Sequence, residues 1–384
     1  MSDLDLIPAG RTFTAQEITV FADSEHRTLD EAIAEADVLV SCPHAGARIP
    51  EELIPFLSPA LTTRLQYDFT DVATDAIVRE WARRDRRIVA VINPHPRLVR
   101  DPNRARPADI AADLTAAIER TRAAGPWQKV DLSGVDAIRP VTFSFFPILE
   151  VPRDDAELRR LVQTFVEVGE RGLGVYERTR DDLTERFVSD KLRVGGRFTR
   201  LSFHDTMNTT TTREGAVSVA RAPEDRLPAV VALSNRGDAR GDERDPADPP
   251  TMDPERLRAL ADAHRAGFRV AQPDAIALNT PYLGSQEIRA AGVRFRELAD
   301  RAADAALELD AVQAEFLREY LLGPEAVDEL HRPGTGWIRE DPAHVREVAE
   351  ACQRSWDLYR ALCPLDPRLV DVGFWSHEER NRPV

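Results

Sequence analysis

The alternation of short apolar segments with longer amphipathic segments is the feature of this sequence that most constrains its fold. Apolar runs typical of buried strands lie at residues 38–42, 87–93, 198–205, 228–233, 275–278 and 311–316. Helical patterns separate them, at residues 28–36, 53–84, 108–124, 155–185, 254–268 and 286–306. Strands that alternate with helices predict a three-layer α/β fold, with a mixed or mostly parallel sheet flanked by helices.

Two of the predicted strands end at a histidine. Pro43 ends the hydrogen-bond ladder of the first strand and Gly46 lets the backbone turn, so His44 is left at the carboxyl end of that strand. The third strand ends in the same way at His204. Because open α/β sheets bind their ligands at the carboxyl ends of the strands, we expect both histidines to lie at one edge of the sheet.

The segment after the second strand carries several arginines on a rigid loop. Prolines at positions 94, 96 and 102 exclude a helix there, which predicts that Arg97 and Arg104 are held on a fixed loop. Arginines in such a position are suited to bidentate recognition of carboxylates. We therefore expect a small-molecule anionic substrate.

The composition limits the partners and the compartment of the chain. The 384 residues carry a net charge of −15, which repels polyanions, so we expect no nucleic-acid and no membrane partner. The three cysteines lack metal-finger or redox spacing, as is typical of a reducing compartment. The sequence shows no secretory signal, and no segment reaches the roughly 18 apolar residues that a membrane span requires. These features predict a cytoplasmic protein.

The pattern of elements divides the chain into three parts. Residues 1–36 are expected to form an irregular arm and a helix, and residues 37–322 a catalytic α/β domain. Residues 323–384 are predicted to be a helical extension that packs on this domain, because their apolar residues, including Trp356, Leu358 and Leu362, have no strands with which to enclose a separate core.

Five short motifs together resemble the N-formylglutamate amidohydrolase family, which has a zinc-carboxypeptidase-like fold. The motifs are Ser41-Cys42-Pro43-His44-Ala45-Gly46, Phe69-Thr70-Asp71-Val72-Ala73-Thr74-Asp75, the set Arg97, Asp101, Asn103 and Arg104, Ser202-Phe203-His204-Asp205, and Val312-Gln313-Ala314-Glu315-Phe316. The arginine set matches the family pattern in full. Phe69, Ser202 and Asp205 depart from it, since the family has Asp, Asp and Ser at these positions.

The resemblance implies a role for each of these residues. One zinc ion would be held by His44, Asp71 and His204, with Asp68 as the substitute for Asp71. Glu315 would be the general base for the attacking water, and Arg97 would stabilise the oxyanion. The residues implied for substrate binding are Asn103 and Arg104, which would hold a carboxylate, and Gln313, Asn208 and Tyr282 as weaker candidates for the pocket wall.

These roles predict a zinc-dependent amidohydrolase that cleaves the amide of an N-formyl or N-acyl amino acid. One alternative is a carboxypeptidase or aspartoacylase-like hydrolase on the same fold, which only substrate profiling would separate. Another is a non-catalytic carboxylate-binding protein that has lost the metal. A histidine phosphatase is excluded, because its nucleophilic histidine lies in Arg-His-Gly and here Pro43 precedes His44.

Overall fold

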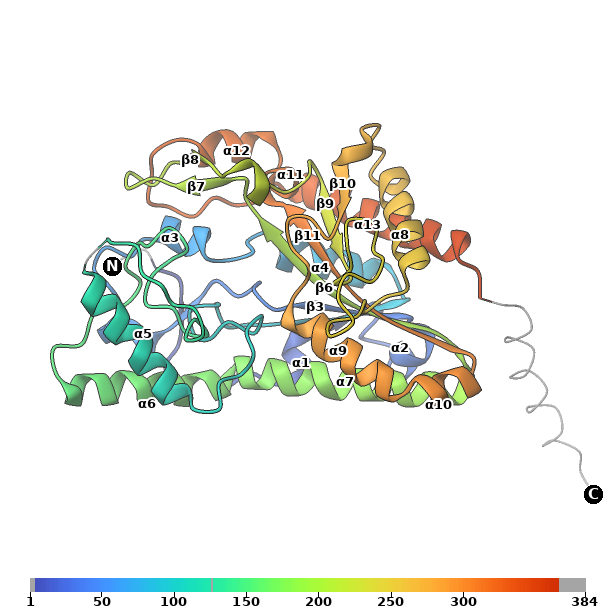
Figure 1. Cartoon of the computed structure of the whole chain (residues 1–384), viewed down its shortest axis with the longest axis horizontal. Coiled ribbons are helices and arrows are strands. Elements are labelled where there is room, and N and C mark those ends of the chain that lie inside the picture. The colour runs from blue at the N-terminus through green and yellow to red at the C-terminus, as the bar shows by residue number, and fades with distance from the viewer. Residues whose placement is uncertain (1–3, 126, 366–384) are drawn as a thin grey trace, which may run out of the picture.

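A seven-stranded sheet in which most neighbouring strands are parallel runs through the centre of the molecule (Figure 1). The computed structural model describes residues 4–365 except residue 126. In spatial order the strands are β10 (Ile276–Leu278), β9 (Val231–Ser234), β11 (Leu307–Leu317), β6 (Gly196–Thr206), β3 (Val38–Cys42), β5 (Ile88–Ile92) and β2 (Thr19–Phe21). The pairs β9–β11 and β5–β2 are antiparallel, and the other neighbours are parallel.

Helices cover both faces of this sheet, which explains why strands such as β3 are buried throughout. Val38 and Val40 pack against one helical layer, and Leu39 between them packs against the other. The first layer consists of α4 (Thr74–Arg84), α8 (Pro254–Gly267) and α13 (Pro342–Leu362). The second consists of α1 (Ala15–Ile18), α2 (Leu29–Glu35), α7 (Leu173–Val194), α9 (Gln286–Glu297) and α10 (Ala299–Asp304). The predicted three-layer α/β fold with a mixed sheet is confirmed.

The order of the strands creates a natural ligand site beside β3. From β3 the chain first adds β5 on one side, and β6 is added later on the other side. Such a reversal opens a crevice at the carboxyl ends of the strands. His44 follows β3 and His204 lies near the end of β6, so both histidines reach the same edge.

The remaining elements surround that edge. Next to it lies a lobe built from helices and loops between residues 49 and 171, which encloses a small core of its own. The further elements are β1 (Leu6–Ile7), β4 (Ile49–Pro50), α3 (Thr63–Asp68), α5 (Ile110–Ala124), α6 (Asp155–Arg171), β7 (Thr209–Thr211), β8 (Val217–Ala220), α11 (Arg318–Leu322), α12 (Pro324–Leu330) and the 3₁₀ turns η1 (Glu51–Phe56), η2 (Pro223–Asp225) and η3 (Pro273–Ala275). None of the helices among the described residues is both long and apolar enough to cross a membrane.

Several sequence predictions about secondary structure are wrong, and the helical segments predicted at residues 53–84 and 286–306 are each divided into separate helices. The arm before residue 28 is not wholly irregular, because Thr19–Phe21 form the edge strand β2; three residues are too short for a recognisable alternation. The single helix predicted for residues 155–185 is two helices that meet at Gly172. A Cβ on Gly172 would lie 2.4 Å from the His95 ring, and His95 Nδ1 accepts a hydrogen bond from the Leu173 N–H at 3.3 Å.

The helical extension contacts the first helical layer through Trp356, as predicted, but otherwise through residues that were not predicted. Helix α13 buries the stripe Val345, Val348, Ala349, Cys352, Trp356 and Tyr359. The predicted contributions of Leu358 and Leu362 are wrong, since these side chains are 39% and 56% exposed. Residues 366–384 of the predicted extension lie outside the described residues, and the division of the chain at residues 36 and 322 stays a prediction.

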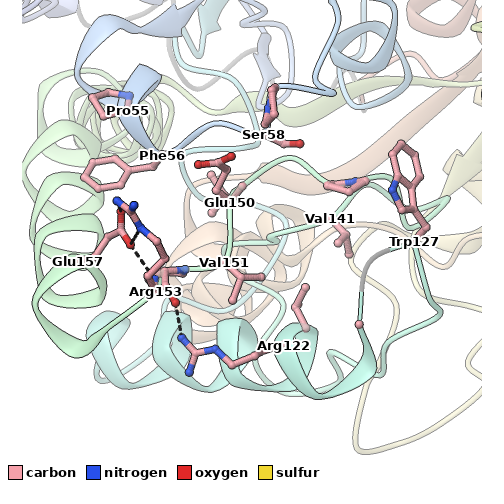
Figure 2. Close-up of a pocket in the computed structure, with 16 residues that line it drawn as sticks. Pro55, Phe56, Ser58, Arg122, Trp127, Val141, Glu150, Val151, Arg153 and Glu157 are labelled. Atoms are coloured by element: carbon pink, nitrogen blue, oxygen red, sulfur yellow. Dashed lines mark hydrogen bonds and ion pairs between the residues drawn. The ribbon is translucent and has the colours of Figure 1, made fainter.

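A cavity of about 670 Å³ lies in the lobe beside α5 and α6 (Figure 2). Phe56, Val141 and Trp127 form much of its wall. Three of its charged side chains have local partners, since Arg153 pairs with Glu157 at 3.2 Å and Arg122 donates to a backbone carbonyl. None of the predicted site residues lines this cavity.

Candidate metal and catalytic site

His44 is held at the end of β3 by the neighbouring loop and by Asp71. Asn93, directly after β5, donates a hydrogen bond from Nδ2 to the Pro43 carbonyl at 2.7 Å. A Cβ on Gly46 would meet backbone atoms of the β5 loop at 2.6 Å, so only glycine permits this approach. The Asp71 N–H donates to the His44 carbonyl at 3.1 Å, which ties the two residues together.

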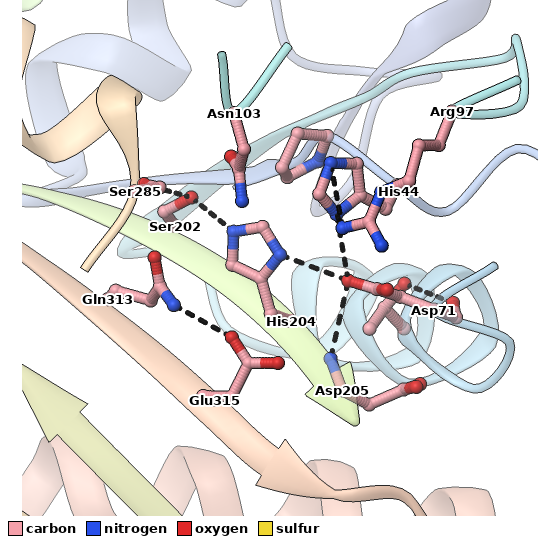
Figure 3. A network of polar contacts seen from close by, with 12 residues as sticks. His44, Asp71, Arg97, Asn103, Ser202, His204, Asp205, Ser285, Gln313 and Glu315 are labelled. Carbon is pink, nitrogen blue, oxygen red and sulfur yellow. Dashed lines mark hydrogen bonds and ion pairs between the residues drawn. The ribbon is translucent and has the colours of Figure 1, made fainter. Parts of the chain in front are cut away.

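Three potential metal ligands converge at this point (Figure 3). One ligand atom each from His44, Asp71 and His204 lies within 4.8 Å of the others, and all three residues are buried. Asp71 Oδ2 lies 3.4 Å from His44 Nδ1 and 3.0 Å from His204 Nδ1. Two imidazole nitrogens and one carboxylate are a ligand set of catalytic zinc sites, so these residues fit a divalent metal.

The far nitrogen of each imidazole has its own partner. His44 Nε2 lies 2.7 Å from Asp101 Oδ1, and His204 Nε2 lies 2.9 Å from Ser202 Oγ. With the protons on the Nε2 atoms, the Nδ1 lone pair of each histidine would be available to a metal ion. Outer partners of this kind fix the tautomer of a ligating histidine.

Glu315 and Gln313 enter the site from β11, the strand next to β6. As alternate residues they point to the same face, and the parallel register places Glu315 beside His204 and Gln313 beside Ser202. Gln313 Nε2 donates to Glu315 Oε2 at 2.7 Å. Burial raises the pKa of Glu315 above its usual value. A carboxylate with a raised pKa beside the ligands is well suited to accept a proton.

Arg97 lies across His44 on the substrate side. Its Nη2 donates to His44 Nδ1, and its Nε lies 3.4 Å from Asp101 Oδ2. The guanidinium also lies over the rings of Phe69, at 5.8 Å, and Phe143, at 5.3 Å. Phe69, where the resemblance has an aspartate, therefore contributes a cation–π contact that helps to hold Arg97.

The charges of the site keep its two aspartates ionised. Burial alone would raise the pKa values of Asp71 and Asp101. The nearby His44 and His204 nevertheless hold the pKa of Asp71 well below its usual range, and Arg97 and His44 do the same for Asp101. At neutral pH, Asp71 is thus available as a ligand and Asp101 as an acceptor for His44.

A cavity of about 550 Å³ opens above these groups, and most of the predicted site residues line it. The predicted residues that line it are Asp71, Arg97, Asn103, Arg104, Tyr282, Gln313 and Glu315. Asn103 Oδ1 and Gln313 Oε1 are buried without a hydrogen-bond partner among the described residues. Both oxygens are therefore free to accept a hydrogen bond from a ligand.

Asn208 does not belong to the lining of this cavity. Its Nδ2 donates to the Leu227 carbonyl at 3.0 Å, and its Oδ1 accepts from the Leu227 N–H at 2.7 Å. Both ends of the amide are thus used to hold the loop after β8. The side chain of Asp68, the alternative ligand, lies outside the described residues.

Sequence reasoning missed several groups around the site. Arg221 lines the cavity and donates to the Tyr282 hydroxyl at 2.8 Å, but it follows a short strand whose pattern is too weak to predict. Asp205, a departure from the family pattern, pairs with the buried Arg318 and accepts from the Ala73 N–H at 3.0 Å. A lone Asp beside a histidine does not reveal such a distant partner.

Comparisons with known proteins identify the family and the fold of this chain. The model of the family described as N-formylglutamate amidohydrolase matches residues 36–321. Among solved structures, the crystal structure of N-formylglutamate amidohydrolase from Ralstonia eutropha JMP134 superposes with a TM-score of 0.51 at 19% sequence identity, covering 90% of this chain and 97% of that chain. No curated protein matches the chain. The structural likeness shows the fold, and the family match over most of the chain shows that this protein belongs to the N-formylglutamate amidohydrolase family.

Proposed function

We propose that this protein is a zinc-dependent amidohydrolase that cleaves the amide of an N-formyl or N-acyl amino acid with water. The observation that carries the proposal is the convergence of His44, Asp71 and His204 beneath a cavity that also exposes Glu315 and Arg97. A zinc ion held by these three ligands would supply an acidified water and polarise the substrate carbonyl.

The protein's own groups account for the proton transfers and the developing charge. Glu315 takes the proton of the attacking water and returns it to the leaving nitrogen, with its carboxylate oriented by Gln313. Arg97 donates hydrogen bonds to the oxyanion as the carbonyl becomes tetrahedral. One lone pair cannot serve two partners, so the guanidinium of Arg97 is available to the substrate whenever His44 Nδ1 is used as a ligand.

We assign Asn103 and Arg104 to the substrate carboxylate, and their position in the cavity wall supports this role. Arg104 Nε pairs with Asp136 at 2.6 Å, which orients the guanidinium, and its side chain is 39% exposed toward the cavity. Arg97 and Arg221 add positive charge to the same cavity. In a protein with a net charge of −15, such a local concentration of cations favours a small anionic substrate.

Metal analysis and a substrate screen test the proposal. Purified full-length protein is expected to hold about one zinc ion per chain, and removal of the metal by a chelator should abolish hydrolysis of N-formyl amino acids until zinc is restored. Undiminished hydrolysis by metal-free protein would contradict the proposal. Preferential release of C-terminal amino acids from peptides would support the carboxypeptidase alternative, and binding of carboxylates without hydrolysis would support the non-catalytic one.

A further inference from the structure

Glu287 is a buried carboxylate beneath the site and is neither a proposed metal ligand nor part of the cavity wall. It lies in the first turn of α9, on the face of the sheet that also carries His204 and Glu315. Its Oε2 accepts hydrogen bonds from Ser41 Oγ at 2.7 Å and Ser202 Oγ at 3.3 Å. Its Oε1 accepts from the Tyr176 hydroxyl and Arg180 Nη1, both at 2.7 Å.

Ser202 connects this carboxylate to a predicted metal ligand. Its single hydroxyl proton is donated to Glu287, which leaves the oxygen to accept from His204 Nε2 at 2.9 Å. The donors therefore run in one direction, from the His204 Nε2–H to Ser202 and from Ser202 to Glu287 (Figure 3 shows the first link). His44 has the same arrangement in a shorter form, since its Nε2 contacts the Asp101 carboxylate directly.

Glu287 stays ionised at neutral pH and therefore acts only as a hydrogen-bond acceptor. Burial alone would raise its pKa, but the guanidinium groups of Arg180 and Arg200 lower the pKa of Glu287 to about 2. An ionised carboxylate has no proton to donate, so Glu287 can only accept a hydrogen bond from the Ser202 hydroxyl. While Ser202 donates to Glu287, its oxygen is left to accept from His204, which places the His204 proton on Nε2 and leaves Nδ1 facing Asp71.

We propose that Glu287 and Ser202 form a positioning relay that holds His204 in the Nε2–H tautomer and so presents its Nδ1 to a divalent metal. The relay rests on the proposed metal site. Neither residue touches the substrate, and both act through His204. The alternative is that Glu287 only joins α7 to α9 through its pair with Arg180 and that Ser202 is incidental to the metal site.

The chain offers a matched pair of variants, because Ser41 and Ser202 donate to the same oxygen of Glu287 and only Ser202 contacts His204. Full-length protein freed of metal with a chelator is titrated with Co²⁺, and the dissociation constant is read from the visible absorption of the ion. Ser202→Ala is expected to weaken Co²⁺ binding by about 10- to 100-fold, as is usual for loss of an outer partner of a ligating histidine. Ser41→Ala is expected to change it by less than about threefold.

The imidazole N–H signals of the Co²⁺-bound protein give a second measurement that a purely structural role would not change. Two paramagnetically shifted, slowly exchanging imidazole N–H signals are expected for the wild type, one from His44 and one from His204. In Ser202→Ala, only the signal from His204 should be lost to exchange with water. Glu287→Gln should weaken Co²⁺ binding at least as much as Ser202→Ala, since an amide can donate to Ser202 and reverse the relay.

The outcomes separate the relay from the metal site itself. Wild-type affinity in Ser202→Ala, or in folded Glu287→Gln, overturns the relay, and so does equal weakening by Ser41→Ala and Ser202→Ala. Ser202→Ala leaves Glu287 paired with Arg180, so it decides the matter even if Glu287→Gln does not fold. Failure of the wild type to bind Co²⁺ would instead overturn the proposed site of His44, Asp71 and His204.

Discussion

At the scale of single residues, burial distinguishes the two groups that are proposed to act on the substrate. Glu315 lies on a strand among buried groups, and burial shifts its pKa upward toward the range of a useful base. Arg104 lies on a loop at the rim of the cavity, where Asp101 and Asp136 support its positive charge although burial opposes it. The first is therefore suited to proton transfer, and the second to holding an anion in the ground state and the transition state alike.

Replacing Glu315 by Gln tests its role as the base. The amide has the same shape but cannot accept the proton, so kcat should fall by roughly 10²- to 10⁴-fold. Zinc content should remain that of the wild type, measured by elemental analysis of the same preparation. Loss of the metal together with the activity would show that Glu315 is a ligand and that the base lies elsewhere.

Replacing Arg104 by Ala tests the proposed carboxylate contact. Loss of a bidentate, charge-assisted contact that is present in both states should raise KM and leave kcat nearly unchanged, at a cost of roughly 2–4 kcal/mol. The matched control is Arg106→Ala in the same segment, because Arg106 does not line the cavity and pairs with Glu170 at 2.9 Å. An unchanged KM for every carboxylate substrate would assign the Arg97–Arg104 loop a purely structural role.

The sequence predicted most of the residues that the structure brings to the site, and the misses share a physical cause. His44, His204 and Glu315 were predictable because they lie at strand ends or in short motifs. Glu287 was missed because its contacts join α9 to strands that are distant in the sequence. Asn208 was misplaced because a polar residue in a loop can bind either a ligand or the backbone, and here Leu227 takes both ends of its amide.

At the scale of secondary-structure elements, the strongly periodic segments were predictable and the breaks were not. The strands around His44 and His204 and the helix that became α8 lie within a few residues of their predicted positions. The break between α6 and α7 arises from His95, a residue of another segment that occupies the space beside Gly172. Such a tertiary contact has no signature in the periodicity of the helix itself.

Helix α8 also carries a buried histidine that should make stability depend on pH. His264 donates from Nδ1 to the Leu260 carbonyl at 2.8 Å and stacks on Phe268, and burial lowers its pKa to about 4. The unfolded chain, with a pKa near 6.5, binds a proton that the folded chain excludes. The contribution of neutral His264 to the free energy of unfolding is therefore fully present above about pH 6.5. It is lost as the pH falls from about 6.5 to 4, and the total loss is about 3 kcal/mol.

Urea unfolding of the wild type and of His264→Phe between pH 4 and 8 measures this contribution. The difference in unfolding free energy between the two proteins should change by up to about 3 kcal/mol across that window, while contributions shared by both, such as that of His95, cancel. The exposed His331→Phe is the control and should leave the pH dependence as it is in the wild type. A constant difference between wild type and His264→Phe would contradict the prediction.

At the scale of the whole molecule, the C-terminal helix α13 packs against elements from the first quarter of the chain. Trp356 packs beside Trp81 of α4 with ring centroids 6.4 Å apart, and Arg360 pairs with Asp37 at the start of β3 at 2.8 Å. The same helix packs along α8. The core on this face of the sheet is therefore completed only by the predicted C-terminal extension.

A pair of substitutions in α13 measures that contribution. Trp356→Ala should lower the free energy of unfolding by about 3–5 kcal/mol, because it empties a fully buried space between α13 and α4. Leu358→Ala, two residues further on and facing solvent, should change it by no more than about 0.5 kcal/mol. Equal effects of the two substitutions in denaturant unfolding would show that α13 does not contribute this core.

Removal of the whole extension should therefore leave a catalytic domain that cannot stay in solution. A chain that ends at Leu322 keeps every predicted metal ligand and Glu315, yet it exposes the apolar faces of α4 and α8, including Trp81 and Leu260. An uncovered apolar surface on that scale leads to aggregation, so the truncated chain should appear in the insoluble fraction while the full chain is soluble. Soluble fraction, cooperative thermal unfolding and Co²⁺ binding are measured side by side. A soluble truncated chain that unfolds cooperatively and binds Co²⁺ as tightly as the full chain would contradict this prediction, because it would show that residues 37–322 enclose a complete core without α13.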